Sequence, residues 1–307
     1  MFAERLICSW IGALGLAAGA YCQTYVTFSV SEASATTPYS INGQGAVAGT
    51  LSTNQHGFVR DPGGTITIID PPGSLGTTAF SINDEGAVTG YYYAADRGGG
   101  HGYVRHPEGN FTTFDPPGSI FTIPSSINAG GAITGAYNLE RGGIHGFVRR
   151  ANGTFISFDP PESVSTSPNS INAKGFITGQ YRDADQRAHG FVREPSGHII
   201  SFDPPDAILT LPTSINDAGA ITGLYIVANG RAFGFVRDPH GKFTSFDPGP
   251  DTFPKSINDE GAITGYSASD LGESNPHGFV RSPDGTINSS FGAGVPVPGA
   301  VPPKHLR

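Results

Sequence analysis

The tripeptide Ser-Ile-Asn occurs six times in this chain, at intervals of 41 to 45 residues, and each copy begins a similar unit of sequence. The six copies begin at Ser40, Ser81, Ser126, Ser170, Ser214 and Ser256. A fixed period of this size indicates a repeat architecture, in which each unit buries its apolar faces against neighbouring units. The repeats cover roughly residues 24 to 291, so nearly the whole chain belongs to one scaffold.

Each unit contains four short segments that are rich in β-branched and aromatic residues and bounded by Gly, Pro or Asn. In the third unit they are Ser-Ile-Asn (126–128), Gly-Ala-Ile-Thr-Gly (131–135), His-Gly-Phe-Val-Arg (145–149) and Thr-Phe-Ile-Ser-Phe-Asp (154–159). This pattern predicts strands, and the lack of a sustained 3.6-residue period predicts almost no helix. Four antiparallel strands in a unit of this length are typical of a propeller blade. The sequence therefore predicts an all-β protein, a six-bladed β-propeller of four-stranded antiparallel blades.

The ends of the repeat region bear on how such a ring closes. Residues 24–29 (TYVTFS) lie in frame with the fourth segment of a unit, because Ser29 precedes Ser40 by the same 11 residues that separate Asp115 from Ser126. Open sheet edges invite aggregation, so a ring needs its first and last blades joined. We predict that Tyr25 to Phe28 forms the outer strand of the last blade. Residues 286–291 compete for that place.

The first 20 residues have the pattern of a secretory signal peptide. Arg5 precedes an apolar stretch from Leu6 to Ala20 that ends in Ala-Gly-Ala, which is too short for an ordinary membrane span. The prediction is a signal peptide at 1–20, a propeller domain at 21–291, and a Pro-rich disordered tail at 292–307. Location in the periplasm or outside the cell follows. Cys22 would be the one mature cysteine, so no internal disulfide is expected.

The charge of the chain and the length of its apolar stretches limit the classes of partner that it can bind. The net charge is −8 with scattered Lys and Arg, and a chain of this kind lacks the basic patch of a nucleic-acid-binding protein. No stretch after the signal peptide is long and apolar enough to cross a membrane. We expect a monomer whose partner is a carbohydrate or an extracellular protein.

The combination of Ser-Ile-Asn, Gly-Ala-Ile-Thr-Gly, His-Gly-Phe-Val-Arg and Phe-Asp-Pro-Pro resembles the HAF-type extracellular repeat proteins of bacteria. The likeness covers roughly residues 24 to 291 and rests on several motifs at fixed spacing. It implies a secreted repeat protein and supplies no catalytic residues. The pattern departs at Phe233, where His is expected, at Ile69, where an aromatic residue is expected, and at Phe291, in the place of Asp.

Histidine at the start of the third segment and aspartate at the end of the fourth are 14 residues apart in four units. The pairs are His56 with Asp70, His101 with Asp115, His145 with Asp159, and His189 with Asp203. A hairpin places both residues at the same end of the blade, where a His–Asp hydrogen bond would fix the strand ends. General acid–base catalysis is the alternative. Equivalent sites in several units favour the structural role.

The Asn of each Ser-Ile-Asn is followed three residues later by Gly in all six units. Asn can bond its own backbone and Gly can adopt positive φ, so the spacing predicts a tight turn. Carboxamide oxygens around one mouth of a ring could also bind Ca²⁺, although such sites prefer carboxylates. We expect no cofactor, with Ca²⁺ as the alternative.

A binding site on a repeat scaffold must differ between copies, and the connections between the second and third segments vary most. In an up-and-down blade they share one face with the connections between units. Rings there can stack on a sugar or peptide while polar groups bond it, and ordinary solvated loops are the alternative. The candidate binding residues are Tyr91, Tyr92, Asp96, Arg97, Glu140, Arg141, Arg182, Asp183, Asp185, Arg187 and Arg231, with Lys255 as a cation before Ser-Ile-Asn.

The sequence therefore predicts a secreted propeller that binds carbohydrate or protein on its variable face. The alternative is an extracellular polysaccharide lyase or hydrolase, or a metal-dependent lactonase, at the channel mouth. This alternative rests on fold analogy, because six-bladed propellers host such activities. The chain contains no Gly-x-Ser-x-Gly, Walker or His-Glu-x-x-His pattern, which are the common local signatures of hydrolases, nucleotide-binding proteins and zinc proteases.

Overall fold

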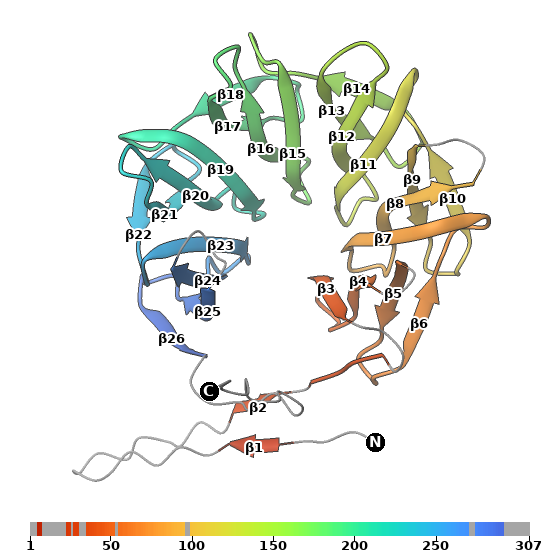
Figure 1. Ribbon diagram of the computed structural model, residues 1–307, viewed down its shortest axis with the longest axis horizontal. Coiled ribbons are helices and arrows are strands. Elements are labelled where there is room, and N and C mark those ends of the chain that lie inside the picture. Colours follow the sequence, from red (N-terminus) through yellow and green to blue (C-terminus); the bar gives the residue numbers. More distant parts are fainter. Residues whose placement is uncertain are drawn as a thin grey trace, which may run out of the picture.

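The computed structural model describes residues 5–7, 23–25, 27–30, 35–52, 55–95, 99–269 and 274–291. All regular structure within these ranges is β-strand, as the sequence predicted. The units follow one another around a central axis, with the first strand of each unit innermost (Figure 1). The predicted tail at 292–307 and most of the predicted signal peptide lie outside the described residues.

Each unit supplies four antiparallel strands. The first unit has β3 (Thr36–Ile41), β4 (Val47–Leu51), β5 (His56–Arg60) and β6 (Ile66–Ile69), and the second has β7 (Ser74–Ile82), β8 (Val88–Ala94), β9 (Gly100–Arg105) and β10 (Phe111–Phe114). The third has β11 (Ser119–Ile127), β12 (Ile133–Leu139), β13 (Ile144–Arg149) and β14 (Phe155–Phe158), and the fourth has β15 (Ser165–Ile171), β16 (Ile177–Arg182), β17 (Ala188–Arg193) and β18 (Ile199–Phe202). The fifth has β19 (Ala207–Ile215), β20 (Ile221–Val227), β21 (Ala232–Arg237) and β22 (Phe243–Phe246), and the sixth has β23 (Asp251–Ile257), β24 (Ile263–Ser269), β25 (Ser274–Arg281) and β26 (Ile287–Phe291).

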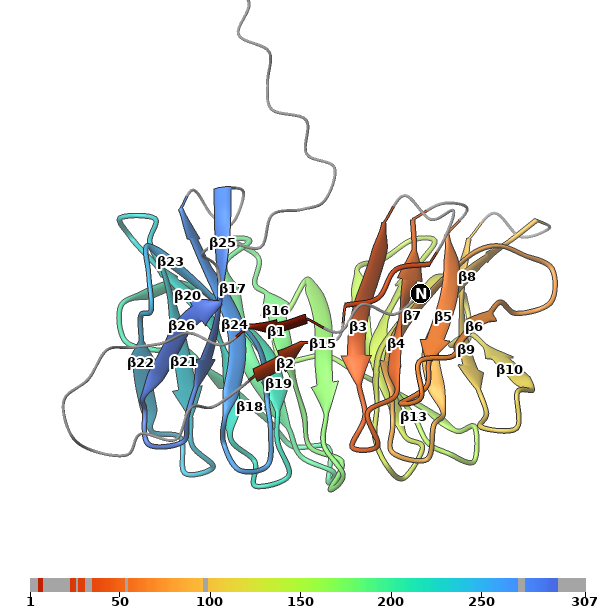
Figure 2. The same cartoon turned by 90° about the horizontal axis from the view of Figure 1, so that it is seen from below.

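The expectation of six separate sheets requires a correction. The first, second, fifth and sixth units each form a four-stranded sheet, whereas the third and fourth units share one eight-stranded sheet. A single parallel pair, Ile144 with Ser165, joins their strands β13 and β15. The cause is local, because the chain entering β15 runs beside the start of β13. The arrangement is propeller-like, and Figure 2 shows the strands running between two faces of the molecule.

The predicted closure by the N-terminal strand is wrong. The outer place in the last sheet is taken by β26, which pairs with β25. A register shift between Gly278 and Val280 sets Phe291 opposite Gly278, the position that Phe246 has opposite Gly234 in the fifth unit. Strand β26 thus takes the place that the sequence assigned to Tyr25–Phe28. Instead β2 (Gln23–Tyr25) pairs with β1 (Arg5–Ile7).

The predicted Asn turns are present in all six units, and they connect the units as well. In each turn the Gly amide donates to the Asn carbonyl, as from Gly175 to Asn172 at 3.0 Å. The Asn172 side chain accepts from the Phe176 amide and donates to the carbonyl of Asn216 in the next unit. Five such bonds join consecutive units, at 2.9 to 3.0 Å. This use of both ends of the carboxamide explains why Asn occurs in the first five units, and in the sixth the side chain of Asn258 accepts from the Ala262 amide in the same way.

Apolar side chains pack between units rather than within them. Each of the five buried clusters among the described residues combines two consecutive units, such as Phe158 with Ile171 and Phe191. The Ile of Ser-Ile-Asn is 5 or 6% exposed in the second to sixth units, but Ile41 of the first unit is 68% exposed. Among the described residues, no Asn side chain of the sixth unit bonds the first. The array therefore has one junction unlike the other five.

A stacked Arg marks most junctions. The guanidinium of Arg193 lies 4.9 Å from the ring centre of Phe158 in the preceding unit, and Arg149, Arg237 and Arg281 have the same arrangement. Its Nη1 donates to the next carbonyl in the chain, as expected for an Arg before a turn. Burial lowers the pKa of Arg193. In the first unit Arg60 lies over Phe28 at 5.1 Å, so the segment 27–30 contributes a ring at the exceptional junction without completing the last sheet.

Candidate functional site

The structure brings all four predicted His–Asp pairs together. In each pair the His Nδ1 lies 2.7 Å from the Asp Oδ2. The second oxygen of Asp115 accepts from the hydroxyl of Thr122 in the next unit at 2.7 Å, and Asp159 and Asp203 do the same with Thr166 and Thr210. The carboxylate therefore joins two strands of its own unit to the inner strand of the next.

The fifth unit keeps this junction with a different residue. Phe233 stands in place of His, and Arg231 donates from Nη2 to Asp247 at 2.6 Å and also reaches the carbonyls of Gly249 and Pro250. Its guanidinium also lies 4.7 Å from the Phe233 ring centre. Arg231 was predicted as a ligand-binding residue, and here it is engaged within its own unit.

In the fourth unit the histidine has a carboxylate on each side. Nε2 of His189 lies 3.2 Å from Oδ2 of Asp183, which belongs to the connection after β16. Burial of the ring is the largest single influence and acts to lower the pKa, but bonds and charges from Asp203 and Asp183 outweigh it and raise the pKa of His189. The bond from His189 and the Arg187 amide lower the pKa of Asp183.

We expect an NMR titration to give His189 a pKa above the usual 6.5 of histidine. Because the shift is upward, the stabilisation is fully present below the ordinary pKa and disappears as pH rises through the raised value. Asp183→Ala should lower the pKa of His189. A wild-type value at or below 6.5, or no response to the substitution, would contradict this assignment.

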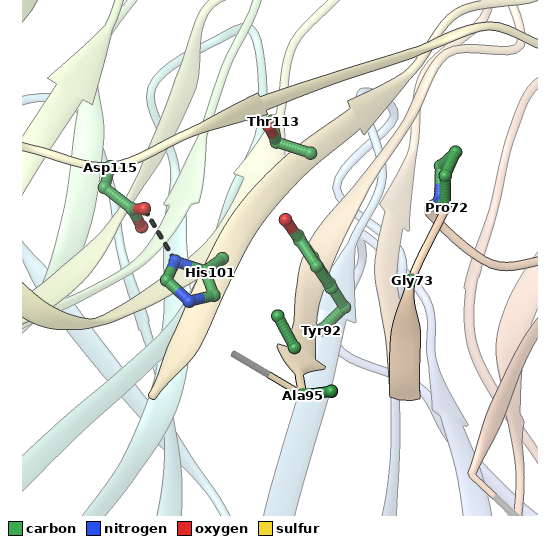
Figure 3. Close-up of a pocket in the computed structure, with 8 residues that line it drawn as sticks. Pro72, Gly73, Tyr92, Ala95, His101, Thr113 and Asp115 are labelled. Carbon is green, nitrogen blue, oxygen red and sulfur yellow. Dashed lines mark hydrogen bonds and ion pairs between the residues drawn. The ribbon is translucent and has the colours of Figure 1, made fainter. Parts of the chain in front are cut away.

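A cavity of about 360 Å³ lies at the end of the second unit (Figure 3). Its polar lining comes from Tyr92, His101, Thr113 and Asp115, and its remaining walls from Pro72, Gly73, Ala94 and Ala95. The rings of Tyr92 and His101 lie side by side, 5.6 Å between centres. Nε2 of His101 is buried, and none of the described residues forms a hydrogen bond with it. A buried polar atom without a partner costs free energy unless something satisfies it.

Strand register explains why this cavity belongs to the second unit. Tyr92 pairs with His101 as Tyr181 pairs with His189, so Ala94 stands where the fourth unit has Asp183. Alanine cannot supply a carboxylate like that of Asp183, which lies 3.2 Å from Nε2 of His189. Thr113 stands where the third unit has Ser157, which bonds the Tyr137 hydroxyl at 2.8 Å. No such bond joins Tyr92 to Thr113, although both residues are described.

Five aromatic rings form a continuous row across the first three units, which we call the aromatic row: Tyr39, Phe80, Tyr91, Tyr93 and Phe121. Neighbouring ring centres are 5.2 to 5.9 Å apart. Tyr39 and Phe80 come from the inner strands β3 and β7, and Tyr91 and Tyr93 from β8. Burial, followed by the neighbouring Tyr91, raises the pKa of Tyr93. The sequence singled out Tyr91 and Tyr92 as loop residues, but they lie in β8.

The remaining predicted residues do not gather at one point. Asp96 and Arg97 lie outside the described residues. Glu140, Arg141, Asp185 and Arg187 are exposed in separate connections, and Arg182 donates to the carbonyl of Gln186 in its own turn. Exposed Lys255 lies 5.3 Å from the ring centre of Tyr266. Reasoning by loop variability thus missed His101 and Thr113, which only register could distinguish from their copies.

Two further observations concern the described residues only. They contain no group of three His, Cys, Asp or Glu side chains arranged to hold a metal ion. They also contain no helix with the length and hydropathy needed to pass through a bilayer.

No protein-family profile matches the chain, and no curated protein is similar to it in sequence. Among solved structures, it is similar to a streptogramin B lyase (17% identity, 82% of this chain, 81% of that chain, TM-score 0.56). It is also similar to an inactive virginiamycin B lyase from Staphylococcus aureus with quinupristin (14%, 94%, 88%, TM-score 0.59). Prolyl endopeptidases match over 88% of this chain and 44% of theirs (13%, TM-score 0.62). At such identities the likeness shows the fold alone, a propeller-like all-β array.

Proposed function

We propose that the protein is a carbohydrate-binding propeller that holds one sugar ring in the cavity at the end of its second unit. The observation that carries the proposal is a cavity walled by an aromatic ring and lined by His101, a residue whose buried Nε2 no described residue satisfies. Ligand sites typically combine an apolar wall with a few placed polar groups. The volume of about 360 Å³ lies within the usual range of such pockets, which is roughly 300–1,000 Å³.

The chemistry of the lining suits hydroxyl groups. The carboxylate of Asp115 has no hydrogen to donate, so Nδ1 of His101 donates the hydrogen of the bond between them. Nε2 of the neutral ring is then a hydrogen-bond acceptor. Because Nε2 is buried, a sugar hydroxyl can donate to it only when the wall of the cavity moves aside. Thr113 and Tyr92 offer hydroxyls that both donate and accept, and the face of Tyr92 offers the apolar contact that a sugar ring needs.

We further propose that the two halves of the eight-stranded sheet act as separate blades, giving six. Each half has four antiparallel strands of its own, and a buried cluster packs between them. Export from the cell and membership of the HAF-type repeat proteins are likewise proposals, supported by the N-terminal pattern and the repeat motifs. The alternative of a lyase, hydrolase or lactonase has fold likeness as its support.

The test is binding of neutral hexoses and N-acetylhexosamines, measured by saturation-transfer NMR and calorimetry on the full chain. We expect at least one of these sugars to bind the wild-type protein. Ala94→Asp should abolish this binding, because it places beside His101 the carboxylate that caps His189 in the fourth unit. The folded state should survive, since the imidazole gains a partner.

Asp183→Ala is the matched opposite change, because it removes the carboxylate beside Nε2 of His189. We expect it to retain the wild-type site and to add a second, weaker one. Absence of binding by every sugar in the panel, or undiminished binding by Ala94→Asp, would overturn the proposal. Loss of binding in Asp183→Ala alone would move the site to the fourth unit.

A further inference from the structure

The aromatic row is specific to one part of the array. At the position before Ser-Ile-Asn, the first two units have Tyr39 and Phe80, whereas the next three have Ser125, Asn169 and Thr213. At the position of Tyr91, they have Ala136, Gln180 and Leu224. The sixth unit has Lys255 and Tyr266 at these two positions, so only the second unit has rings at both. The scaffold does not require rings there, because the third to fifth units lack them.

Core packing does not account for the row. None of its five residues belongs to the buried clusters between units. Tyr39 is 51% exposed and Tyr93 is 37% exposed, and the other three are half-buried. Exposed contiguous apolar surface on a soluble protein marks an interaction site more often than isolated exposed rings do.

The chemistry of the row indicates a neutral, amphipathic partner. Three of the five rings carry a hydroxyl, so each offers an apolar face and a polar edge. The row contains no Asp, Glu, Lys or Arg. At the position before Ser-Ile-Asn the fourth and fifth units have neutral Asn169 and Thr213, and the sixth has Lys255. Sugar rings have the same division, with apolar C–H faces and a polar hydroxyl rim.

The row and the proposed sugar cavity share one strand, β8. Successive side chains of a strand point to opposite faces, so Tyr91 and Tyr93 lie on one face of β8 while Tyr92 walls the cavity on the other. The two surfaces therefore lie on opposite faces of one strand. A glycan with one ring in the cavity has to pass around the end of β8 to reach Tyr93.

We propose that the aromatic row binds further sugar rings of a neutral oligosaccharide whose end occupies the cavity, so that the natural ligand is a glycan chain. This inference rests on the proposed function. It adds a second surface and a dependence on chain length. A Pro-rich peptide is the competing partner, because extended Pro-rich segments also dock on aromatic rows, but it has no use for the hydroxyl-matching cavity.

The experiment compares the best monosaccharide of the panel with its di-, tri- and tetrasaccharides, by calorimetry on the full chain. We expect affinity to rise with chain length in the wild-type protein. Tyr39→Ala and Tyr93→Ala should each lower the affinity for the tetrasaccharide about 2- to 12-fold, the range expected for one aromatic contact. Both variants should leave the affinity for the monosaccharide unchanged. Tyr266→Ala, an aromatic residue of the sixth unit outside the row, is the control and should change neither.

The outcomes separate this inference from the proposed function. If monosaccharide binds but affinity does not rise with length, or both row variants behave as wild type, the row inference is wrong and the cavity stands. If no sugar of any length binds, the proposed function fails. A synthetic peptide with the sequence of residues 292–307, GAGVPVPGAVPPKHLR, provides the last arm. Binding of this peptide that is lost in Tyr39→Ala, without oligosaccharide binding, would assign the row to a Pro-rich partner.

Discussion

Gly135→Ala is expected to destabilise the protein by about 4 kcal/mol or more, an effect that belongs to the exceptional end of single substitutions. A Cβ at this position would lie 2.2 Å from the carbonyl oxygen of Ile123 and 2.7 Å from Cα of Pro124. Both atoms are backbone of β11, so no side-chain rotation relieves the clash. A register shift between Pro124 and Ser126 brings the two strands this close, and β12 can pair there only through glycine.

The measurement is the free energy of unfolding from urea or guanidinium titration. Gly130→Ala in the same unit is the matched control, because its Cβ would have the Asn128 side chain 3.5 Å away as its nearest neighbour. The other units carry Gln44, Glu85, Lys174, Ala218 and Glu260 at this place. We expect a change within about 1 kcal/mol, in the stabilising direction, since alanine restricts the unfolded chain. Comparable losses in both variants would show that the close approach is not the cause.

Much of the local structure was predictable because it depends on residues close in sequence. The interval from Asn172 to Gly175 defines a turn whose bonds lie within four residues, and it recurs six times. The His–Asp interval of 14 residues defines a hairpin, and the two side chains do meet at its end. Alternation and turn chemistry act over such distances, so strand content, turn positions and this pairing follow from the sequence.

Relations between units were beyond that reasoning. Arg193 bonds the turn after it, but its stacking on Phe158 depends on how neighbouring units pack. The same is true of closure. TYVTFS fits the repeat frame, yet β26 takes the place because one register shift brings Phe291 opposite Gly278. The prediction from the repeat frame counted residues along the chain, and such a count does not show where a strand contains a register shift.

The candidate site was predictable only in part, for a related reason. Variability between copies drew attention to Tyr91 and Tyr92, but it placed them in a connection rather than in β8. His101 looked like each of its copies. What distinguishes it is Ala94, a small side chain where the third unit has Leu139 and the fourth has Asp183. Such a site can be recognised only from the strand register, which shows that a larger or charged side chain of other units is missing here.

Phe158→Ala is expected to cost about 3–5 kcal/mol, the usual range for removing a buried phenylalanine. The ring is buried, lies 6.0 Å from the ring of Phe191 in the next unit, and carries the guanidinium of Arg193 on its face. Its removal leaves a cavity at the junction and a buried cation without its aromatic contact. Nearest-neighbour interfaces supply much of the stability of repeat proteins, so hydrogen exchange should accelerate first in β14 and β17.

Phe28→Ala is the comparison that gives this prediction its meaning. Phe28 contacts Phe58 and Arg60 as Phe158 contacts Phe191 and Arg193, but it is half-buried, and Ile41 of the first unit is exposed. The same chemical change should therefore cost less than half as much free energy, measured in the same denaturation experiment. Equal losses would mean that the junction between the first and last units is packed as tightly as the other five. Unequal losses would mean that the array carries its stability along the chain from unit to unit, with the segment 27–30 covering one end.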